Sequence, residues 1–274
     1  MNMTRMAPGE TSATFVGALA NGISVLESFS NVGAELTVSE VARLTGLAPA
    51  TARRSLHTLA ELGYLERWGR RFVLSARILN LASAYLQSSR SEELLLPELR
   101  DLVAKFGDAS SVAIYDKGNV LYIAHYSEQR ATRRIASVGT SYPAYATSLG
   151  KVLLSALDET SFRRYLETTP FRALTSHTIT GAPELTRQIE AARMCGYATS
   201  RDELDYGITA LAVAVRSSRG DVVAALNTSG YSGRVDAHKL IDERLEYLRV
   251  AAQRVWRILE SHPTLLRSLG SFTD

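Results

Sequence analysis

The sequence has little cysteine and no long apolar run. Cys195 is the only cysteine in 274 residues, so no disulfide can form within the chain. The longest apolar stretches, such as 210–215 and 222–226, are far shorter than the roughly 20 residues that cross a bilayer. The N-terminus lacks the apolar core and cleavage site of a secretory signal. These absences predict a cytoplasmic protein with no membrane partner, whose residues 1–14 form a disordered arm.

The charge is divided unevenly along a chain of otherwise ordinary globular composition, with 46% apolar and 22% charged residues. Residues 1–91 carry nine arginines, no lysine and six acidic residues, whereas the remainder carries 22 charges of each sign. Five of those arginines lie between Arg53 and Arg71. At 100 to 200 residues per domain, the length fits about two domains. A basic module that contacts nucleic acid would explain the asymmetry, and so would a solvated basic face.

Helical periodicity dominates the first third of the chain. Leu19, Ile23, Leu26 and Phe29 recur at helical spacing and predict one amphipathic helix. A second, short helix is expected to begin at Thr37 or Ser39 and to end at Gly46.

A third helix is expected to begin at Pro49, which suits the first turn of a helix. Its apolar side is formed by Ala52, Leu56, Leu59 and Gly63. Arg54, His57 and Glu61 lie on the opposite side, flanked by Arg53 and Thr58. Two helices joined by a short glycine-containing turn, with basic groups on the outer face of the second, are typical of a helix-turn-helix.

Two short strands are expected next, over 64–67 and 71–74, with Trp68, Gly69 and Arg70 at the tip of the hairpin. This order predicts a winged helix-turn-helix over 15–75, although helical hairpins and basic turns are common when taken separately. The expected DNA contacts are Thr51, Arg53, Arg54 and His57 on the third helix, with Arg67, Arg70 and Arg71 on the wing.

Residues 76–91 predict a linker helix with a broad apolar stripe that includes Ile78, Leu79 and Leu86. A winged domain reads one half-site, so a dimer that spaces two recognition helices about 34 Å apart is expected. The first helix and the linker are the candidate self-association surfaces. Packing of both stripes within their own chain is the alternative.

The larger domain, 92–262, alternates hairpin-linked strands with helices and predicts an α+β fold on a mostly antiparallel sheet, followed by a C-terminal tail over 263–274. The expected strands are 111–115, 120–126, 134–138, 197–201, 209–216 and 222–228. The expected helices are 94–106, 148–157, 159–166, 184–194 and 236–259.

The loop 139–147 is rich in small and hydroxylated residues and runs directly into a helix. Free amides at that helix start could hold a carboxylate, and Tyr142 and Tyr145 could stack on a ring. The alternative, which we favour from the loop alone, is that Thr147 or Ser148 caps the helix.

No catalytic constellation assembles from the remaining residues. The five histidines are scattered without zinc spacing, and no glycine-rich phosphate loop is present. Asp202, Glu203 and Asp205 form an acidic cluster that a solvated loop explains better than acid–base catalysis. We therefore expect no enzyme activity, cofactor or metal. An enzyme with a winged domain and a ligand-free nucleoid-type DNA binder are the competing classes.

Several segments together resemble the isocitrate lyase regulator (IclR) family of bacterial transcription factors. The matching segments are 37–46, 50–63, 64–74, 146–154, 196–213 and 223–230. The resemblance implies a winged helix-turn-helix, a linker helix and a GAF-like effector-binding domain. It also implies a homodimer or dimer of dimers on operator DNA.

Residues 133–140 and 143–148 look most like the regulators of aromatic catabolism through the beta-ketoadipate pathway. That resemblance implies a carboxylate effector such as protocatechuate, beta-ketoadipate, muconate or 4-hydroxybenzoate. A regulator of another carbon-source pathway that senses a non-aromatic acid is the alternative.

The family's effector pocket maps onto Ser148, Leu149, Asp202, Ala210, Asn227 and Ser229. Ser200 stands where some members have an acid, and Ala210 stands where some have a small polar residue, which implies a larger or more apolar ligand. On physical grounds we add Arg134 and Tyr145, because a ring acid favours a cation and an aromatic face.

Overall fold

The computed structural model describes residues 14–30, 35–128, 136–235 and 237–270. The chain forms two compact units, 1–87 and 88–274, which are described separately. The helix α4 (Ile78–Ser89) lies at the boundary between them.

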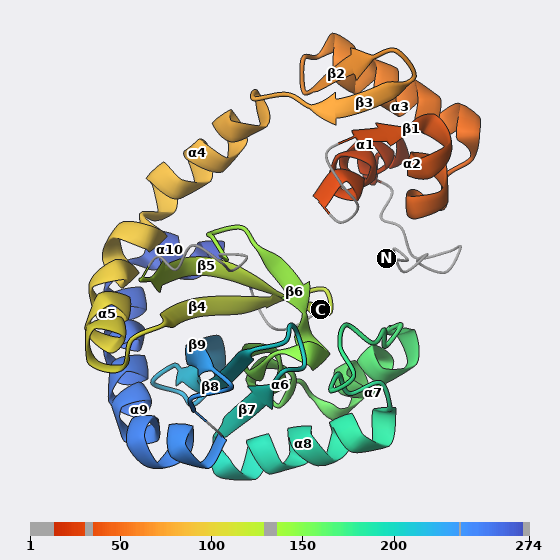
Figure 1. Ribbon diagram of the computed structural model, residues 1–274. Helices are drawn as coiled ribbons and strands as arrows, with labels where there is room; N and C mark the ends of the chain where they lie inside the picture. Colours follow the sequence, from red (N-terminus) through yellow and green to blue (C-terminus); the bar gives the residue numbers. More distant parts are fainter. Residues whose placement is uncertain (1–13, 31–34, 129–135, 236, 271–274) are drawn as a thin grey trace. The chain divides into compact units, whose positions relative to one another are not determined.

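The N-terminal unit is a winged helix-turn-helix, as predicted (Figure 1). Its helices are α1 (Gly17–Glu27), the short 3₁₀ helix η1 (Ser28–Ser30), α2 (Val38–Thr45) and α3 (Pro49–Glu61). Its strands β1 (Glu35–Thr37), β2 (Leu65–Trp68) and β3 (Arg71–Leu74) pair antiparallel in the order β1-β3-β2. Sequence reasoning missed β1, because three residues carry too little alternation to signal a strand.

Local chemistry explains where α2 begins and ends. The Thr37 backbone amide donates to Glu40 Oε2 at 2.7 Å, and the Glu40 amide donates back to Thr37 Oγ1 at 3.3 Å, which is a complete capping box. The hydrogen bonds from Thr37 lower the pKa of the Glu40 carboxyl. Gly46 ends the helix with φ +70°, a conformation that glycine adopts without strain.

The apolar stripe expected on the first helix is only partly buried. Val25 and Phe29 enter the core of the unit, whereas Leu19 is 66% exposed and Ile23 is 48% exposed. The core they join is made by residues of α2, α3 and all three strands: Leu36, Val41, Ala42, Ala52, Leu56, Leu59, Leu65 and Phe72. The predicted inner side of the third helix is thus confirmed for Ala52, Leu56 and Leu59.

The C-terminal unit is built on a six-stranded antiparallel sheet in the order β6-β5-β4-β9-β8-β7. The strands are β4 (Ala109–Asp116), β5 (Asn119–Ser127), β6 (Ser141–Pro143), β7 (Tyr197–Arg201), β8 (Ile208–Arg216) and β9 (Val222–Tyr231). The helices are α5 (Ser91–Phe106), η2 (Ala144–Ala146), α6 (Ser148–Leu154), α7 (Glu159–Thr168), α8 (Ala182–Cys195), α9 (Ala237–Ser261) and α10 (Pro263–Ser268). The predicted α+β class is confirmed.

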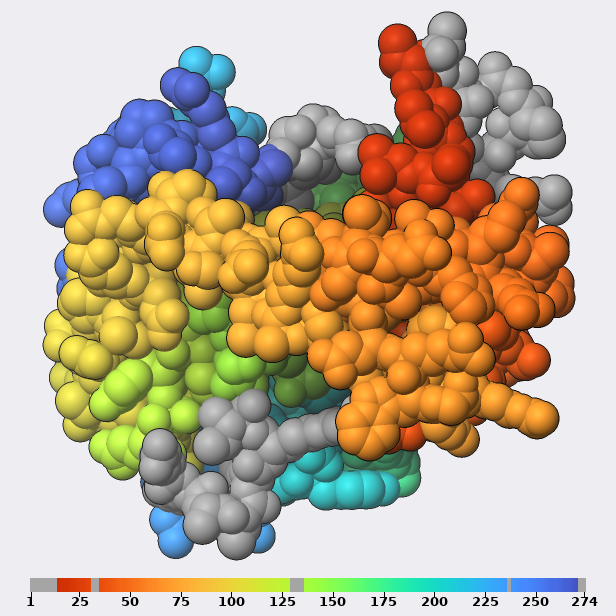
Figure 2. All heavy atoms as spheres, turned by 90° about the horizontal axis from the view of Figure 1, so that it is seen from above, coloured from red at the N-terminus to blue at the C-terminus, as the bar shows by residue number. Residues whose placement is uncertain are grey.

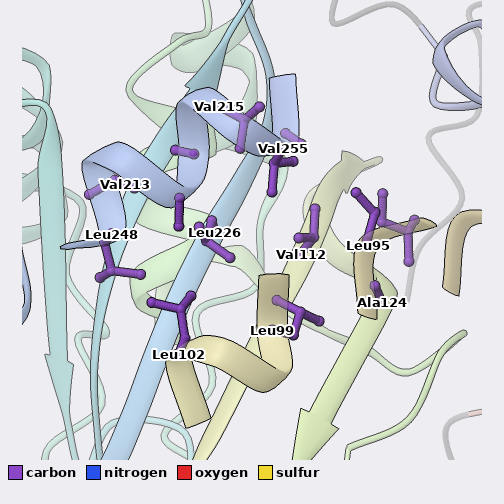
Figure 3. Close-up of a cluster of buried hydrophobic side chains, with 14 of the residues drawn as sticks. Leu95, Leu99, Leu102, Val112, Ala124, Val213, Val215, Leu226, Leu248 and Val255 are labelled. Atoms are coloured by element: carbon purple, nitrogen blue, oxygen red, sulfur yellow. The ribbon is translucent and has the colours of Figure 1, made fainter. Parts of the chain in front are cut away.

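One side of the sheet, here called the α9 face, packs against α5, α9 and α10 (Figures 1 and 3). Its core is aliphatic, and Figure 3 shows Leu99 and Leu102 from α5 near Val112 and Leu226 from the sheet. The opposite side, the α6 face, packs against η2, α6, α7 and α8 through residues such as Leu149 and Ala212.

Arg244 of α9 is a buried cation on the α9 face. Its Nη1 donates to Thr228 Oγ1 at 3.0 Å and to the Ser229 carbonyl at 3.2 Å. Its Nη2 donates to the Phe106 carbonyl at 3.4 Å, and the guanidinium lies over the Phe106 ring. This side chain therefore ties α9 to β9 and to the end of α5.

Three segments of the C-terminal unit differ from the sequence-based expectation. The expected loop 139–147 contains strand β6 and helix η2. No strand occupies residues 136–138 of the expected strand 134–138, and residues 134 and 135 lie outside the described part of the chain. Within the expected C-terminal tail, Pro263 begins helix α10, and Leu265 and Leu269 of this segment join the core of the α9 face.

We expect Gly150→Ala to destabilise the C-terminal unit, because a Cβ at this position would lie 2.1 Å from the Ala144 carbonyl oxygen. Overpacking of this kind costs about 1–3 kcal/mol. Urea unfolding of the purified protein measures the change. Gly22→Ala in α1 is the matched control, since a Cβ there meets nothing within 4 Å. Equal effects of the two substitutions would contradict the close packing of η2 against α6.

Candidate functional site

The outer side of α3 presents the basic groups predicted to contact DNA. Arg53 and Arg54 are exposed, and Thr51 and His57 are half-buried. The imidazole of His57 meets the Phe72 ring edge-on at 5.7 Å between centroids, so α3 and the wing support each other. These four side chains thus share an accessible helix with basic character.

The hairpin turn is one residue tighter than predicted. Trp68 pairs with Arg71 inside the ladder, which leaves Gly69 and Arg70 as the turn. Gly69 has φ +60°, as the first position of a type II′ turn requires. The indole of Trp68 is 70% exposed. The segment that carries this wing is drawn in orange in Figure 2 and lies at the surface.

The three wing arginines differ in their contacts. Arg67 Nε donates to the Gly69 carbonyl at 2.9 Å, and Arg71 lies 3.8 Å from Glu35 and 3.9 Å from Glu40. Arg70 sits in the turn, exposed, without a hydrogen bond or ion pair to the described residues. Arg70 is therefore the wing cation most available to a phosphate.

In the C-terminal unit, strand register gathers polar residues on the α6 face. His125 of β5 is opposite Ser111 of β4, which is opposite Asn227 of β9. In the adjacent row, Ser229 is opposite Ala210, which is opposite Ser200. Alternate residues of a strand point to the same side, so both rows share the face on which Ala212 and Ala225 pack against α6.

The start of α6 leaves one hydroxyl without a partner. Thr147 Oγ1 accepts the Gly150 amide at 2.9 Å, so the expected helix cap is confirmed. Ser148 is 1% exposed, and its Oγ has no hydrogen-bond partner. Leu149 is fully buried in the core beside it. Buried polar atoms are almost always paired, so an unpaired one indicates a missing ligand or water.

Two further unpaired atoms belong to the polar row across the sheet. They are Asn227 Oδ1 and His125 Nε2. Ser111 Oγ lies 2.9 Å from His125 Nδ1, and burial lowers the pKa of this histidine. Sequence reasoning found Asn227 and missed His125 and Ser111, because only the strand register reveals that the three are neighbours.

Aromatic side chains adjoin this polar row. The Tyr122 ring contacts His125 at 6.2 Å and Tyr142 at 5.6 Å between centroids. Tyr145 is buried against Phe171, and its hydroxyl donates to the Arg172 carbonyl at 3.0 Å and accepts the Arg172 amide at 3.1 Å. These contacts fix the position of the Tyr145 ring. Arg134, the cation expected here, lies outside the described residues.

Asp202 shapes the loop after β7. Its Oδ1 accepts the Gly207 amide at 2.6 Å and the Ser232 hydroxyl at 2.7 Å, and its backbone is left-handed, with φ +55°. Ser229, by contrast, keeps a long 3.4 Å bond to the Ala109 carbonyl. Of the expected pocket residues, Ser148 and Asn227 keep an unpaired polar atom for a ligand.

The acidic cluster is not the solvated loop that the sequence indicated. Glu203 is buried, and its Oε1 accepts a hydrogen bond from Lys151 Nζ at 2.6 Å. Lys151 also donates to the Thr199 carbonyl at 3.1 Å. Burial lowers the pKa of Lys151 and raises that of Glu203, each against the pull of the partner's charge. The pair fastens α6 to the loop that contains Asp202.

The described part of the chain contains neither a metal-binding cluster nor a membrane-spanning helix. No group of three or more histidine, cysteine, aspartate or glutamate side chains there could hold a metal ion. None of the helices described has the length and apolar character of a membrane span.

A winged helix-turn-helix followed by an α+β unit with buried, unpaired polar atoms is the arrangement of a ligand-responsive transcription regulator. Family models agree. The IclR helix-turn-helix domain matches residues 18–68, and the bacterial transcriptional regulator IclR C-terminal domain matches residues 83–257. The chain therefore belongs to the IclR family, whose members are transcriptional regulators rather than enzymes.

Curated relatives extend over most of the chain. The Pca regulon regulatory protein of Pseudomonas putida is 34% identical over 88% of this chain and 82% of its own. The p-hydroxybenzoate hydroxylase transcriptional activator of Acinetobacter baylyi is 34% identical over 88% of this chain and 91% of its own.

Solved structures show the same architecture. A putative transcriptional regulator of Rhodococcus is 37% identical, with a TM-score of 0.69 over 90% of this chain and 99% of its own. An IclR homolog of Microbacterium hydrocarbonoxydans, complexed with 4-hydroxybenzoate, is 25% identical, with a TM-score of 0.68 over 89% of this chain and 99% of its own.

We expect Lys151→Met to destabilise the protein by about 3–5 kcal/mol, because Glu203 would remain buried without its counter-ion. The double variant Lys151→Met, Glu203→Leu should recover much of that loss. Arg163→Met, which removes an exposed pair with Glu159, should change stability by less than about 1 kcal/mol. Urea unfolding midpoints of the four proteins measure this. A double variant that is no more stable than Lys151→Met alone would contradict the coupling.

Proposed function

We propose that this IclR-family regulator controls genes of aromatic-compound catabolism in response to a small carboxylate. The observation that carries the proposal is the set of unpaired polar atoms on the α6 face, next to aromatic rings. An aromatic acid supplies both a flat apolar ring and polar ends for such a site. The relatives named for the Pca regulon and for p-hydroxybenzoate hydroxylase, and the homolog that holds 4-hydroxybenzoate, support the same class of ligand.

The proposed effector site combines the unpaired polar atoms with the apolar side chains around them. Ser148 and Asn227 supply hydrogen bonds, and Leu149, Ala210 and Tyr145 supply apolar contact. Asp202 holds the neighbouring loop, and Ser229 offers its weakly bonded hydroxyl. Arg134 is proposed as the counter-ion of the carboxylate, on the chemical ground that an anion in a poorly solvated site needs one.

The proposed operator contacts divide into two sets. Thr51, Arg53, Arg54 and His57 on α3 read bases in the major groove, and Arg67, Arg70 and Arg71 on the wing contact the backbone. A pseudo-palindromic operator requires two copies of the unit, so we propose a homodimer or a dimer of dimers in the cytoplasm. The exposed Leu19 and Ile23 of α1 are available for that association.

The alternative is a regulator of the same family that senses a non-aromatic acid. Such a ligand would satisfy the polar atoms but would carry no ring to pack beside Tyr122. The aromatic proposal uses both features of the site, and effector binding by the purified protein decides between the two.

Substitution of the arginines should separate base reading from backbone contact. We expect Arg54→Ala to weaken operator binding and to relax base preference, with about 1–3 kcal/mol lost at the contacted base. Arg70→Ala should weaken binding to all sequences alike and reduce the salt slope by about one. Fluorescence anisotropy with operator and scrambled duplexes, at several salt concentrations, measures both. Unchanged operator binding by Arg54→Ala would show that α3 docks differently.

A thermal-shift screen tests the effector class. A ligand at a hundredfold excess over its Kd stabilises the folded state by about 2.7 kcal/mol. We expect a higher midpoint with one of protocatechuate, beta-ketoadipate, muconate or 4-hydroxybenzoate, and none with pyruvate or glyoxylate. A shift with pyruvate or glyoxylate alone would refute the aromatic assignment.

A further inference from the structure

Asn227 places a chemical requirement on the ligand. The residue is 6% exposed, and its amide oxygen Oδ1 has no hydrogen-bond partner. An amide oxygen only accepts hydrogen bonds, so the group that satisfies it must donate one. An ionised carboxylate cannot donate, and aromatic or aliphatic C–H groups donate weakly. A plain carboxylate would therefore leave this buried oxygen unpaired.

His125 offers the complementary group in the same row of the sheet. If the Ser111 hydroxyl donates to Nδ1 at 2.9 Å, the proton of the neutral imidazole resides on Nε2. Burial lowers the pKa of His125 and so favours that neutral form. Nε2 is buried without a partner, and in this tautomer it can donate to an acceptor on the ligand.

A hydroxyl group both donates and accepts hydrogen bonds, so it can satisfy both atoms at once. His125 and Asn227 stand on strands separated only by β4, so two strand spacings, about 9.6 Å, separate their backbones. The two side chains and one ligand oxygen can bridge such a span. The Tyr122 ring, which lies beside His125 and in turn contacts Tyr142, suits a hydroxyl carried by an aromatic ring.

We propose that His125, oriented by Ser111, and Asn227 together recognise a hydroxyl group of the ligand, so that the effector is a hydroxylated acid. The proposal rests on the ligand-binding role given above to the α6 face, and it adds His125 and Ser111 as specificity-determining residues. It separates hydroxylated acids from ring-cleavage products that lack an O–H group.

Isothermal titration of the full-length protein with matched acids tests the proposal. Protocatechuate, 3-hydroxybenzoate and 4-hydroxybenzoate are compared with benzoate and 4-fluorobenzoate, and 3-hydroxybutyrate is compared with butyrate. Sites built around a hydroxyl reject the analogue that lacks it because their own polar groups stay unpaired. We expect at least one hydroxylated acid to bind about tenfold or more tightly than its parent.

The variants assign that preference to named atoms. His125→Phe should bring the affinity ratio of hydroxylated acid to parent close to one while benzoate still binds. His125→Gln, whose amide nitrogen falls near the position of Nε2, should retain the preference, and Ser111→Ala should reduce it in part. His177→Phe, at an exposed histidine, is the matched control and should leave the ratio unchanged. Thermal midpoints verify that each variant is folded.

The outcomes distinguish this proposal from the broader one. If only 3-hydroxybutyrate binds more tightly than its parent acid, recognition of a hydroxyl group by His125 and Asn227 is supported and the aromatic effector is refuted. If benzoate or beta-ketoadipate binds as tightly as the hydroxylated acids, the proposed recognition of a hydroxyl group is overturned, whereas the proposed role in aromatic catabolism is not. If both His125 variants lose the same factor of affinity for the hydroxylated acid and for its parent, hydroxyl recognition by His125 is also overturned. Binding of none of these acids would overturn both.

Discussion

The proposed effector site of the C-terminal unit depends on the buried ion pair between Lys151 and Glu203. Taking two charges out of water is costly, and the cost is offset only when the two groups meet in good geometry. That condition fixes the distance between α6 and the loop after β7. Ser148 belongs to the first of these segments and Asp202 to the second. The ion pair does not touch the proposed ligand atoms, yet it determines the frame in which they are held.

The same sheet separates structural and ligand-binding tasks by the alternation of its strands. The α9 face is aliphatic and closes against long helices, whereas the α6 face interrupts its apolar core with a polar row. A ligand can satisfy the unpaired atoms of Ser148, Asn227 and His125 on the α6 face. Alternation along β4 separates two neighbouring serines: the Ser111 hydroxyl pairs with His125 on the α6 face, whereas the Ser110 hydroxyl donates to the Asn227 backbone carbonyl.

Sequence reasoning succeeded where the signal is local. Periodicity, the cap at Thr37 and the turn at Gly69 predict the winged unit, and paired hairpins predict an antiparallel sheet. It failed where the signal is tertiary. Glu203 was predicted to be a solvated acid because its partner, Lys151, is 52 residues away in the sequence. His125 was overlooked because only the strand register makes it a neighbour of Asn227.

Strand β9 limits which amino-acid substitutions can alter the ligand preference of this protein. Asn227 and Ser229 lie on the α6 face, in the proposed effector site. The hydroxyl of Thr228 between them accepts a hydrogen bond from Arg244, which also donates to the Phe106 carbonyl. Three consecutive residues thus serve two opposite sides of one sheet. A lineage that acquires a new inducer by substitutions at 227 or 229 must keep the backbone of 228 in place. We therefore expect new ligand preferences to arise in concert with compensating changes on α9.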